Sequence, residues 1–595
     1  MRPLYRYLKI KDKSPNILTR MIRKLSRDSR NAAILGLVFF VLYSATLCPT
    51  VFRGDSGEII TAISSSGVIH PPGYPLFTLI GKLFLALIPF GEPALRIGMF
   101  VALAGAVAVA LLYRVIREIG TPPLASLGAA AFFGVSLTFW SQCNRVEVYS
   151  FHVLLALLAI WQCLRYRATG EEKALYLACI ALGIGLAHHL TIVLLVPGLL
   201  VLCGMRLWRV AGLARRLLIG ITLLAVSGLP LYGVLWVRLA DPDVFWAHVT
   251  GSSYRFYFAV PRSLDTLQRP LKLLMTIFVE NGFGPLSVLS ALGGLALGRR
   301  SPGVLCGLLL MALAITLYCF CYTIEDIAPY YLVVLALGVV LVGVVLGQVE
   351  QALVSRARPL AVRLAACFVL PTLGLALNFP ACNLHTATGI RQLAQQKLRA
   401  CAPRSVLLCQ GDEDTYSLRY THNLLKMRPD VTVLDTEQLS QSDMTQLEKR
   451  PLASTYFGTS AQNLAQLGES PALEWLRTNY LPVPRGVILS LVPKTTALAL
   501  TQVLAEGKAS WDTIELPELP LAPTATEVDG DYTRRHYVTM LCNYGFLYEQ
   551  AGQTQQASAV FLIALNWAPE LAQATLKGME ARSRVAAELL RRTQL

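Results

Sequence analysis

The chain is poor in charged residues and in recognisable cofactor motifs. Only 15% of its 595 residues are Asp, Glu, Lys or Arg, whereas 54% are hydrophobic and the mean hydropathy is +0.51. A soluble domain could not bury so much apolar surface. The sequence contains no P-loop, no dinucleotide-binding fingerprint and no Gly-x-Ser-x-Gly nucleophile turn. These absences argue against the common nucleotide-dependent enzymes and hydrolases, and the composition indicates a polytopic α-helical membrane protein.

Cysteine is present but is not paired along the chain. The thirteen cysteines are scattered, mostly in apolar segments, and none of them forms a Cys-x-x-Cys spacing. Structural zinc sites and dithiol redox motifs are therefore not expected. If the region at and after the last apolar run is extracytoplasmic, the cysteines in it could form disulfides. These are Cys382, Cys401, Cys409 and Cys542.

Basic residues are unevenly distributed. The formal net charge of +16 could indicate nucleic-acid binding, but ten Lys and Arg crowd residues 1–30, ahead of the first apolar run. Such a tail is typical of a cytoplasmic N-terminus beside anionic lipid, and we expect no cleavable signal peptide. Further basic loops should lie on the same, inner side. They contain Arg114 and Arg117, Arg165 and Arg167, Arg206 to Arg216, Arg299 and Arg300, and Arg356 to Arg363.

Long apolar runs predict a bundle of about 11 to 12 membrane segments. They fall near residues 31–49, 94–113, 124–140, 148–165, 174–188, 190–205, 217–238, 284–298, 303–321, 330–349 and 361–380. A further run, 71–90, begins with a Pro-rich turn, and the basic loops alternate correctly only if this run does not cross. Acidic and histidine residues of the connecting loops then gather on the outer face.

Gly54–Pro75 is the most informative stretch of the chain. Asp55 and Glu58 are three residues apart, so both carboxylates share one face of a short helix. His70 follows twelve residues after Glu58 and opens a His-Pro-Pro turn that ends at Tyr74 and excludes a regular helix there. Acids beside a stiff turn at the membrane surface suggest a ligand site; an interfacial loop with a capping acid is the alternative.

Two more groups of polar residues interrupt the apolar segments. Arg145 and Glu147 lie between two spans, just before Tyr149, and form either a local ion pair or part of a site in which Glu147 joins Asp55. Arg145 would then meet a phosphate. His188 and His189 are adjacent and would point about 100° apart on a helix, so they are not expected to share one metal. One of them could serve a ligand, or both could be buried and hydrogen-bonded.

The loop from residue 241 to 255 mixes aromatic and polar side chains. Aromatic rings beside polar groups suit sugar stacking and phosphate contact, but they also suit an interfacial belt. Its candidate contacts are Asp241, His248, Tyr254 and Arg255.

From about Asn383 the composition changes to that of a small α/β domain. Ser405–Gln410 and Val431–Leu434 are predicted strands, and Ser417–Met427 a predicted helix. The GDEDT sequence between them could bind a cation, but it lacks EF-hand spacing. A turn in which Asp414 or Thr415 caps the helix is the preferred interpretation.

The end of the chain matches one tetratricopeptide repeat over Leu541–Pro569. Small and aromatic residues stand at that repeat's spacing. They are Gly545, Tyr548, Gly552, Ala557, Phe561, Ala564 and Pro569. The predicted domains are therefore a basic cytoplasmic tail (1–30), a transmembrane domain (31–382), an extracytoplasmic α/β domain (383–530) that ends in a linker over Trp511–Asp531, and a helical repeat end (531–595).

Several of these motifs together resemble one family. They are GDSGE followed by HPPGYPLF, then WSQ and EVY, the His pair, the Asp-Pro loop with its His, Thr-Gly and Tyr, and GDEDT with RPDV. This set is similar to the transmembrane protein 260-like protein O-mannosyltransferases, a branch of the C-type membrane glycosyltransferases. The resemblance covers most of the chain, and the GDSGE and HPPGYP block is its most specific part.

The resemblance implies a transferase that takes a sugar from a polyprenyl-phosphate carrier on the extracytoplasmic side. It implies Asp55 as the base for the acceptor hydroxyl, Glu147 as a second acid, and a pocket for the carrier shaped by the turn at His70. One position departs from the pattern, because a Trp-Gly-Asp-Pro sequence is expected where the chain has Leu239-Ala240-Asp241-Pro242.

Together with the residues above, the resemblance therefore implies an inverting transfer of a mannose-like sugar from a polyprenyl-phosphate donor to a protein or other extracytoplasmic acceptor. The expected catalytic residues are Asp55, Glu58 and Glu147. The expected substrate contacts are His70, Tyr74, Arg145, Tyr149, His188, His189, Asp241, His248, Tyr254 and Arg255. Whether a divalent metal is required is not specified by the sequence, and nucleic acid is not an expected partner. A bacterial inner membrane is the expected location.

The rival hypothesis is a non-enzymatic transporter or membrane scaffold that displays the outer region. Transporters often show charges at the membrane midplane and internal repeats of their spans. The chain shows no clear internal repeat, and its acids gather at one face. The sugar, the carrier and the acceptor are not specified by these residues.

Overall fold

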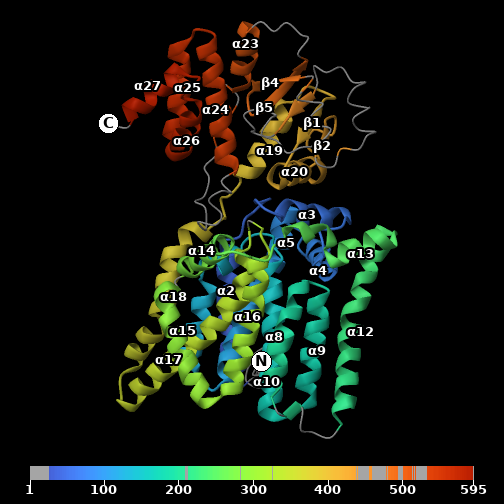
Figure 1. Cartoon of the computed structure of the whole chain (residues 1–595), viewed down its shortest axis with the longest axis vertical. Coiled ribbons are helices and arrows are strands. Elements are labelled where there is room, and N and C mark those ends of the chain that lie inside the picture. Colours follow the sequence, from blue (N-terminus) through green and yellow to red (C-terminus); the bar gives the residue numbers. More distant parts are fainter. Residues whose placement is uncertain are drawn as a thin grey trace, which may run out of the picture.

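A computed structural model describes residues 26–593, except 205, 208–211, 282, 325, 437–438, 440–454, 459–477, 479, 494–499, 512–513, 515 and 517–531. Most of the predicted basic tail and of the predicted linker at 511–531 lie outside the described residues. A bundle of helices occupies one half of the molecule, and the C-terminal region, residues 389–593, occupies the other (Figure 1).

Each predicted apolar run corresponds to a helix or helix pair of the bundle. In chain order these are α2 (Arg27–Ala45), α5 (Pro93–Glu118), α6 (Pro123–Gly134) with α7 (Leu137–Ser141), α8 (Tyr149–Thr169), α9 (Glu172–Leu186), η1 (Leu190–Leu195) with α10 (Val196–Cys203), α12 (Leu213–Leu239), α15 (Phe283–Arg300), α16 (Pro302–Cys321), α17 (Leu332–Ser355) and α18 (Leu360–Cys382).

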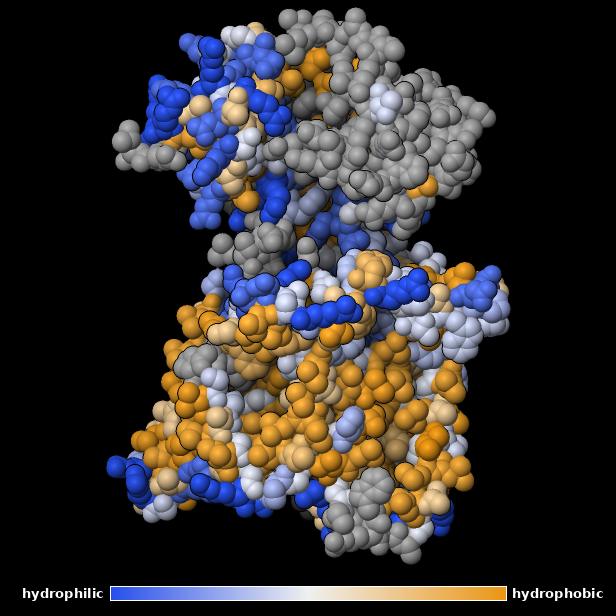
Figure 2. All heavy atoms as spheres, viewed as in Figure 1, coloured by the Kyte–Doolittle hydropathy of each residue, from blue (hydrophilic) through white to orange (hydrophobic). Residues whose placement is uncertain are grey.

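The bundle is a multi-pass membrane domain. Among the described residues, five segments are long and apolar enough to cross a bilayer: Pro93–Glu118, Leu213–Leu239, Pro302–Cys321, Ala328–Ser355 and Leu360–Cys382. Figure 2 shows a broad hydrophobic band around the bundle, with hydrophilic residues above and below it. Exposed apolar side chains on such a band require lipid around them.

Small residues allow the helices of the bundle to approach one another closely. A side chain at Gly128 of α6 would clash with the backbone oxygen of Cys367 in α18, and one at Gly293 of α15 with that of Leu341 in α17. Glycine at such contacts lets backbones pack without a hydrophobic driving force in lipid. The packing fixes the positions from which the connecting loops leave the bundle.

Segment 71–90 does not cross the bundle, which is the condition under which the basic loops alternate correctly. It contains α4 (Pro75–Leu87), whose thirteen residues span about 20 Å, less than the roughly 30 Å of a hydrocarbon core. The Thr50 hydroxyl donates to Glu92 Oε2 at 2.6 Å, so the chain leaves and re-enters the bundle at one end. We call this end the polar rim; it carries α3 (Ser56–Ser65) and α4 (Figure 1).

The polar rim also carries an excursion between α12 and α15. It consists of α13 (Pro242–Thr250), η2 (Ser252–Tyr257) and α14 (Leu264–Glu280), and η3 (Ala328–Tyr331) lies before α17. The helix α14 was not predicted from the sequence. Its apolar positions are broken by Arg269 and Lys272, so they form a stripe rather than a continuous run.

Among its described residues, the C-terminal region contains a five-stranded mixed sheet in the order β2-β1-β3-β5-β4. The strands are β1 (Val406–Cys409), β2 (Thr432–Asp435), β3 (Thr455–Phe457), β4 (Tyr480–Arg485) and β5 (Ile488–Pro493). β1 is parallel to β2 and β3, and β5 is antiparallel to β3 and β4. The two strands predicted from the sequence are both present.

The helix after β1 starts earlier than predicted. α20 (Asp412–Arg419) begins inside the GDEDT sequence, its N-cap is Gly411, and it continues into the π-turn η4 (Tyr420–Leu424). Three acids in the first turn favour a helix start there, because they face the positive end of the helix dipole. The predicted capping role of Asp414 or Thr415 is therefore wrong. Asp414 is instead buried against Lys397.

The other helices that the structure describes in this region are α19 (Gly389–Ala400), α23 (Leu500–Trp511), α24 (Tyr532–Gln550), α25 (Thr554–Trp567), α26 (Pro569–Met579) and α27 (Arg584–Thr593). In α24, Gly545 faces the ring of Phe561 in α25, where a Cβ would lie 2.5 Å from Phe561 Cε1. This is the close contact that the predicted repeat requires, and its assignment as a tetratricopeptide repeat stays a prediction.

The disulfides left open by the sequence do not form in this structure. All thirteen cysteines lie among the described residues and are free thiols, and Cys382, Cys401, Cys409 and Cys542 are buried. Cys382 and Cys542 pack in two separate apolar clusters, and Cys401 and Cys409 share a third without forming a bond.

Candidate functional site

The first two acids of the site are placed by the start of α3. Gly54 has a φ of +69°, and Asp55 follows as the N-cap residue, with Glu58 in the first turn. The positive end of the helix dipole favours carboxylates at both places. The Asp55 side chain makes no capping hydrogen bond, so its oxygens face the loop across from the helix.

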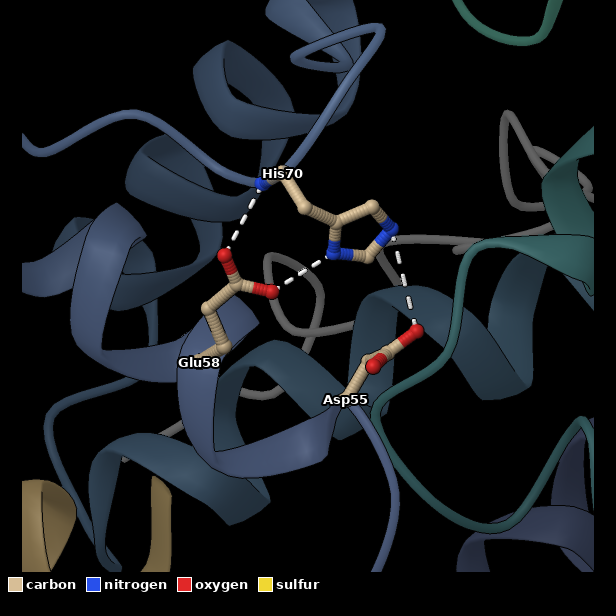
Figure 3. Close-up of side chains that lie close together, drawn as sticks. All are labelled: Asp55, Glu58 and His70. Atoms are coloured by element: carbon tan, nitrogen blue, oxygen red, sulfur yellow. Dashed lines mark hydrogen bonds and ion pairs between the residues drawn. The ribbon is translucent and has the colours of Figure 1, made fainter. Parts of the chain in front are cut away.

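His70 lies between these two carboxylates (Figure 3). Its Nδ1 is 2.6 Å from Glu58 Oε2, and its Nε2 is 3.7 Å from Asp55 Oδ2. The backbone N–H of His70 also donates to Glu58 Oε1 at 2.9 Å. The side chains of Asp55, Glu58 and His70 are 28%, 17% and 19% exposed, so this polar cluster is half-buried and still reached by solvent.

The cluster is electrostatically coupled. Burial alone would lower the pKa of His70, but the charges of Asp55 and Glu58 raise this pKa to about 10. Burial raises the pKa of Asp55, with the charge of Glu58 adding to the rise and that of His70 opposing it. An imidazolium therefore holds the two acids together at neutral pH.

Glu147 lies near Asp55, on the loop between α7 and α8, in one of the two arrangements that the sequence left open. It is only 6% exposed, and a Cβ built on Gly54 would lie 3.4 Å from its Oε1. Burial and the charge of Asp55 raise the pKa of Glu147, while Arg145 opposes the rise. Asp55 and Glu147, from distant parts of the sequence, thus lie close enough for their charges to interact.

Two arginines stand beside these acids. The guanidinium groups of Arg145 and Arg53 lie 5.6 and 5.3 Å from the ring centre of Phe52. Arg145 is 7% exposed, and its charge acts on Asp55 and Glu147. Arg145 was predicted; Arg53 was not, although it directly precedes the GDSGE sequence.

A cavity of about 240 Å³ borders the cluster. Aromatic rings form much of its wall, together with His189, whose Nδ1 is 2.7 Å from the Thr191 hydroxyl. The cavity is connected to the acids through Tyr74, whose hydroxyl lies 3.3 Å from His70 Nε2. The tyrosines that line it are Tyr74, Tyr254, Tyr318, Tyr322 and Tyr330. Of these, Tyr74 and Tyr254 were predicted contacts, and Tyr149 packs behind them against His189 at 5.9 Å between ring centres.

Three further predicted contacts hydrogen-bond to backbone groups, and a fourth, Arg255, is exposed. His188 is fully buried with its Nε2 2.9 Å from the Val148 carbonyl, and His248 Nε2 lies 2.9 Å from the Ile69 carbonyl, where it supports the His70 turn. Asp241 is exposed and caps α13 by accepting the N–H groups of Asp243 and Val244. Arg255 is exposed on η2.

The C-terminal region contributes residues that the sequence analysis did not assign to the site. Glu413 Oε1 accepts the N–H of Gly54 at 3.1 Å, and the charge of Asp412 acts on Asp55. Burial raises the pKa of Glu413 to about 7. The run of acids in GDEDT was the one sequence feature that could have indicated this role. Because it lies far from Asp55 in the sequence, the contact could not be predicted.

The donor atoms of Asp55, Glu58 and His70 lie within 4.8 Å of one another. Two carboxylates and an imidazole are a ligand set that divalent metals accept. Such an ion would have to replace the hydrogen bond and the ion pair that His70 makes with Glu58 and Asp55. We therefore describe the cluster as an ion-pair network.

Fold and site together define a multi-pass helical membrane protein with a polar centre at one rim of its bundle. Within this class, residues 55–211 match the family model described as the Protein O-mannosyl-transferase TMEM260 N-terminal domain, and residues 390–455 match the TMEM260-associated domain 2. Two stretches of this chain thus match models of the TMEM260 family, and the resemblance found in its motifs is confirmed.

Curated relatives carry the same description. The chain is 26% identical over 438 residues to the Protein O-mannosyl-transferase TMEM260 of Mus musculus, covering 67% of this chain and 61% of that protein. It is 31% identical over 191 residues to the Dictyostelium discoideum protein, covering 29% and 23%. The chain therefore spans less than two thirds of either relative.

A solved structure of similar arrangement is ArnT from Cupriavidus metallidurans in the apo state. It is 16% identical, with a TM-score of 0.49, over 72% of this chain and 92% of that chain.

Proposed function

We propose that the chain is a C-type membrane glycosyltransferase that moves a mannose-like sugar from a polyprenyl-phosphate carrier to a hydroxyl of a protein acceptor. The observation that carries the proposal is the meeting of Asp55, Glu147 and Arg145 beside a cavity lined with tyrosines. Two curated relatives that match parts of the chain are described as protein O-mannosyl-transferases.

In the proposed reaction Asp55 acts as the base. It takes the proton of the acceptor hydroxyl while the oxygen attacks the anomeric carbon of the sugar. The bond between that carbon and the carrier phosphate breaks, and its electron pair stays on the phosphate. An inverted glycoside and a free polyprenyl phosphate result.

The surroundings of Asp55 suit this role. Its raised pKa makes it a stronger base than an ordinary aspartate, and its 28% exposure leaves room for an acceptor. Arg145 and Arg53 supply positive charge for the phosphate that leaves. Glu58 holds His70, and His70 keeps both acids in place.

The proposal places the polar rim on the extracytoplasmic side. Arg117 and Arg167 lie in the last turns of α5 and α8, at the ends opposite the rim, where a cytoplasmic face would be expected. The C-terminal sheet region is then an extracytoplasmic α/β domain, and α24 and α25 form the repeat at its end. A bacterial inner membrane fits this arrangement.

The test is transfer by the purified protein carrying Asp55→Asn. With a labelled polyprenyl-phosphate mannose donor and a Ser- or Thr-rich acceptor peptide, we expect a loss of about 10²-fold or more in rate, since a general base contributes that much. Asp55 makes no capping bond, so expression should stay unchanged, and the unfolding temperature should fall only by what the loss of its 3.7 Å ion pair with His70 costs. Asp243→Asn, on the exposed α13, is the matched control. A wild-type rate in the Asp55→Asn protein would remove Asp55 from catalysis.

The same assay separates the rival function. A transporter or a scaffold would move no label into the peptide at any donor concentration. Label that crosses the membrane in sealed vesicles, with none in the peptide, would favour transport.

A further inference from the structure

The helix α20 of the C-terminal region packs directly on the helix that carries the acids. A Cβ built on Gly57 of α3 would lie 2.7 Å from the backbone oxygen of Tyr416 and 2.9 Å from its Cβ. The two backbones therefore approach as closely as glycine allows. Any larger residue at position 57 would push α20 away from the site.

One hydrogen bond from α20 reaches the backbone beside Asp55. Glu413 Oε1 accepts the N–H of Gly54 at 3.1 Å. Gly54 has the positive φ that turns the chain into α3, and on its other side it faces Glu147 Oε1. The orientation of Asp55 is thus fixed by a peptide that is held from the C-terminal region.

The position of α20 is itself held by buried contacts. Lys397 Nζ of α19 is 2.6 Å from Asp414 Oδ1, next to Glu413, and 2.7 Å from the hydroxyl of Tyr532 in α24. Lys397 and Asp414 are 1% and 0% exposed. A pair so deeply buried does not exchange its partners for water and sets the register of α20 against the sheet.

A second attachment lies beside the first. Glu92, which precedes α5, accepts the hydroxyl of Tyr420 from η4 at 2.6 Å and is also paired with Arg391 of α19. The C-terminal region is therefore tied to the polar rim at two points. It packs directly against the polar rim and is not attached only through the chain that follows α18.

We propose that Glu413 is a positioning residue for Asp55, and that the C-terminal region completes the reactive centre by holding the Gly54 peptide. The inference rests on the proposed function for its chemistry and on the contacts of α20 for its geometry. It assigns a role to the segment that matches the TMEM260-associated domain 2.

The first test compares Glu413→Ala with Glu413→Gln. The alanine variant loses the acceptor for Gly54 N–H, and we expect kcat to fall about tenfold or more with little change in the KM for donor, as for loss of a hydrogen bond felt in the transition state. The glutamine variant keeps a carbonyl oxygen there and should stay within about threefold of wild type. Glu588→Ala, on an exposed part of α27, is the control.

The second test does not depend on transfer. Hydrogen exchange of the peptide that contains Gly54 should be faster in Glu413→Ala than in wild type, with Glu413→Gln close to wild type. Unchanged exchange, an unchanged kcat in Glu413→Ala, or a glutamine variant as slow as the alanine variant would each overturn the inference. If the wild-type protein transfers no sugar, the proposed function fails, and hydrogen exchange alone then decides the role of Glu413.

Discussion

Two charged clusters lie close together in this molecule and differ in their access to solvent. Asp55, Glu58 and His70 are 17–28% exposed and border a cavity, whereas Lys397 and Asp414 are at most 1% exposed. Both contain an ion pair with a 2.6 Å contact. Similar chemistry therefore serves two purposes: the closed pair holds elements together, and the open cluster leaves charge within reach of a ligand.

The largest effect is expected from breaking the closed pair. Lys397→Met leaves Asp414 charged and without its lysine in a fully buried place, which should cost about 3–5 kcal/mol of unfolding free energy. Thermal unfolding of the purified protein in detergent measures this loss. Replacing both partners, as Lys397→Met with Asp414→Leu, should restore much of it, because no uncompensated charge remains.

An unfolding temperature of the Lys397→Met protein equal to that of wild type would show that the pair does not hold α20. The difference in solvent exposure between the two clusters would then not distinguish charges that hold the fold together from charges that face a ligand.

A smaller, pH-dependent effect is expected in the open cluster. The folded pKa of His70, about 10, lies above the ordinary value of 6.5. His70 thus stabilises the fold fully below about pH 6.5, and this contribution is lost as the pH rises towards about 10. Relative to His70→Gln, wild type should be more stable by about 1.5–3 kcal/mol at pH 6, the value of a hydrogen bond to a charged group.

Unfolding of the two proteins between pH 6 and pH 10 checks the sign. The stability difference should shrink steadily with rising pH. A difference that grows with pH, or one that is constant, would mean that His70 is neutral in the folded protein. The cluster would then again be a candidate metal site.

Much of the bundle was predictable because lipid imposes one rule on every span. Each apolar run became a helix, and the Pro-rich segment 71–90 stayed at the rim because its helix is too short to cross. The helix α14 was missed, since its apolar positions are interrupted by basic residues such as Arg269 and Lys272. A search for continuous hydrophobic runs does not detect an amphipathic helix of this kind.

The candidate site was predicted only where its residues share a local pattern. Asp55, Glu58 and His70 stand in one stretch whose spacing already brings them together. The contact of Glu413 with Gly54 joins residues more than 350 positions apart and depends on the packing of α20 on α3, which no local pattern reports. The role of Asp241 stays a prediction, because an acid before Pro and a helix is as suited to capping, which the structure shows, as to binding.

The smallest effect is expected at that cap. Asp241 accepts the N–H groups of Asp243 and Val244 at 2.9 and 3.0 Å on an exposed helix, so Asp241→Ala should cost about 1 kcal/mol or less of stability. Asp241→Asn keeps an acceptor oxygen and should cost only a few tenths of that. Because Asp241 lies outside the polar cluster, both variants should transfer sugar at the wild-type rate in the peptide assay. A loss of transfer in both variants with normal stability would place Asp241 in contact with substrate. The loop that carries Asp241 would then belong with the ligand-facing charges rather than with the structural ones.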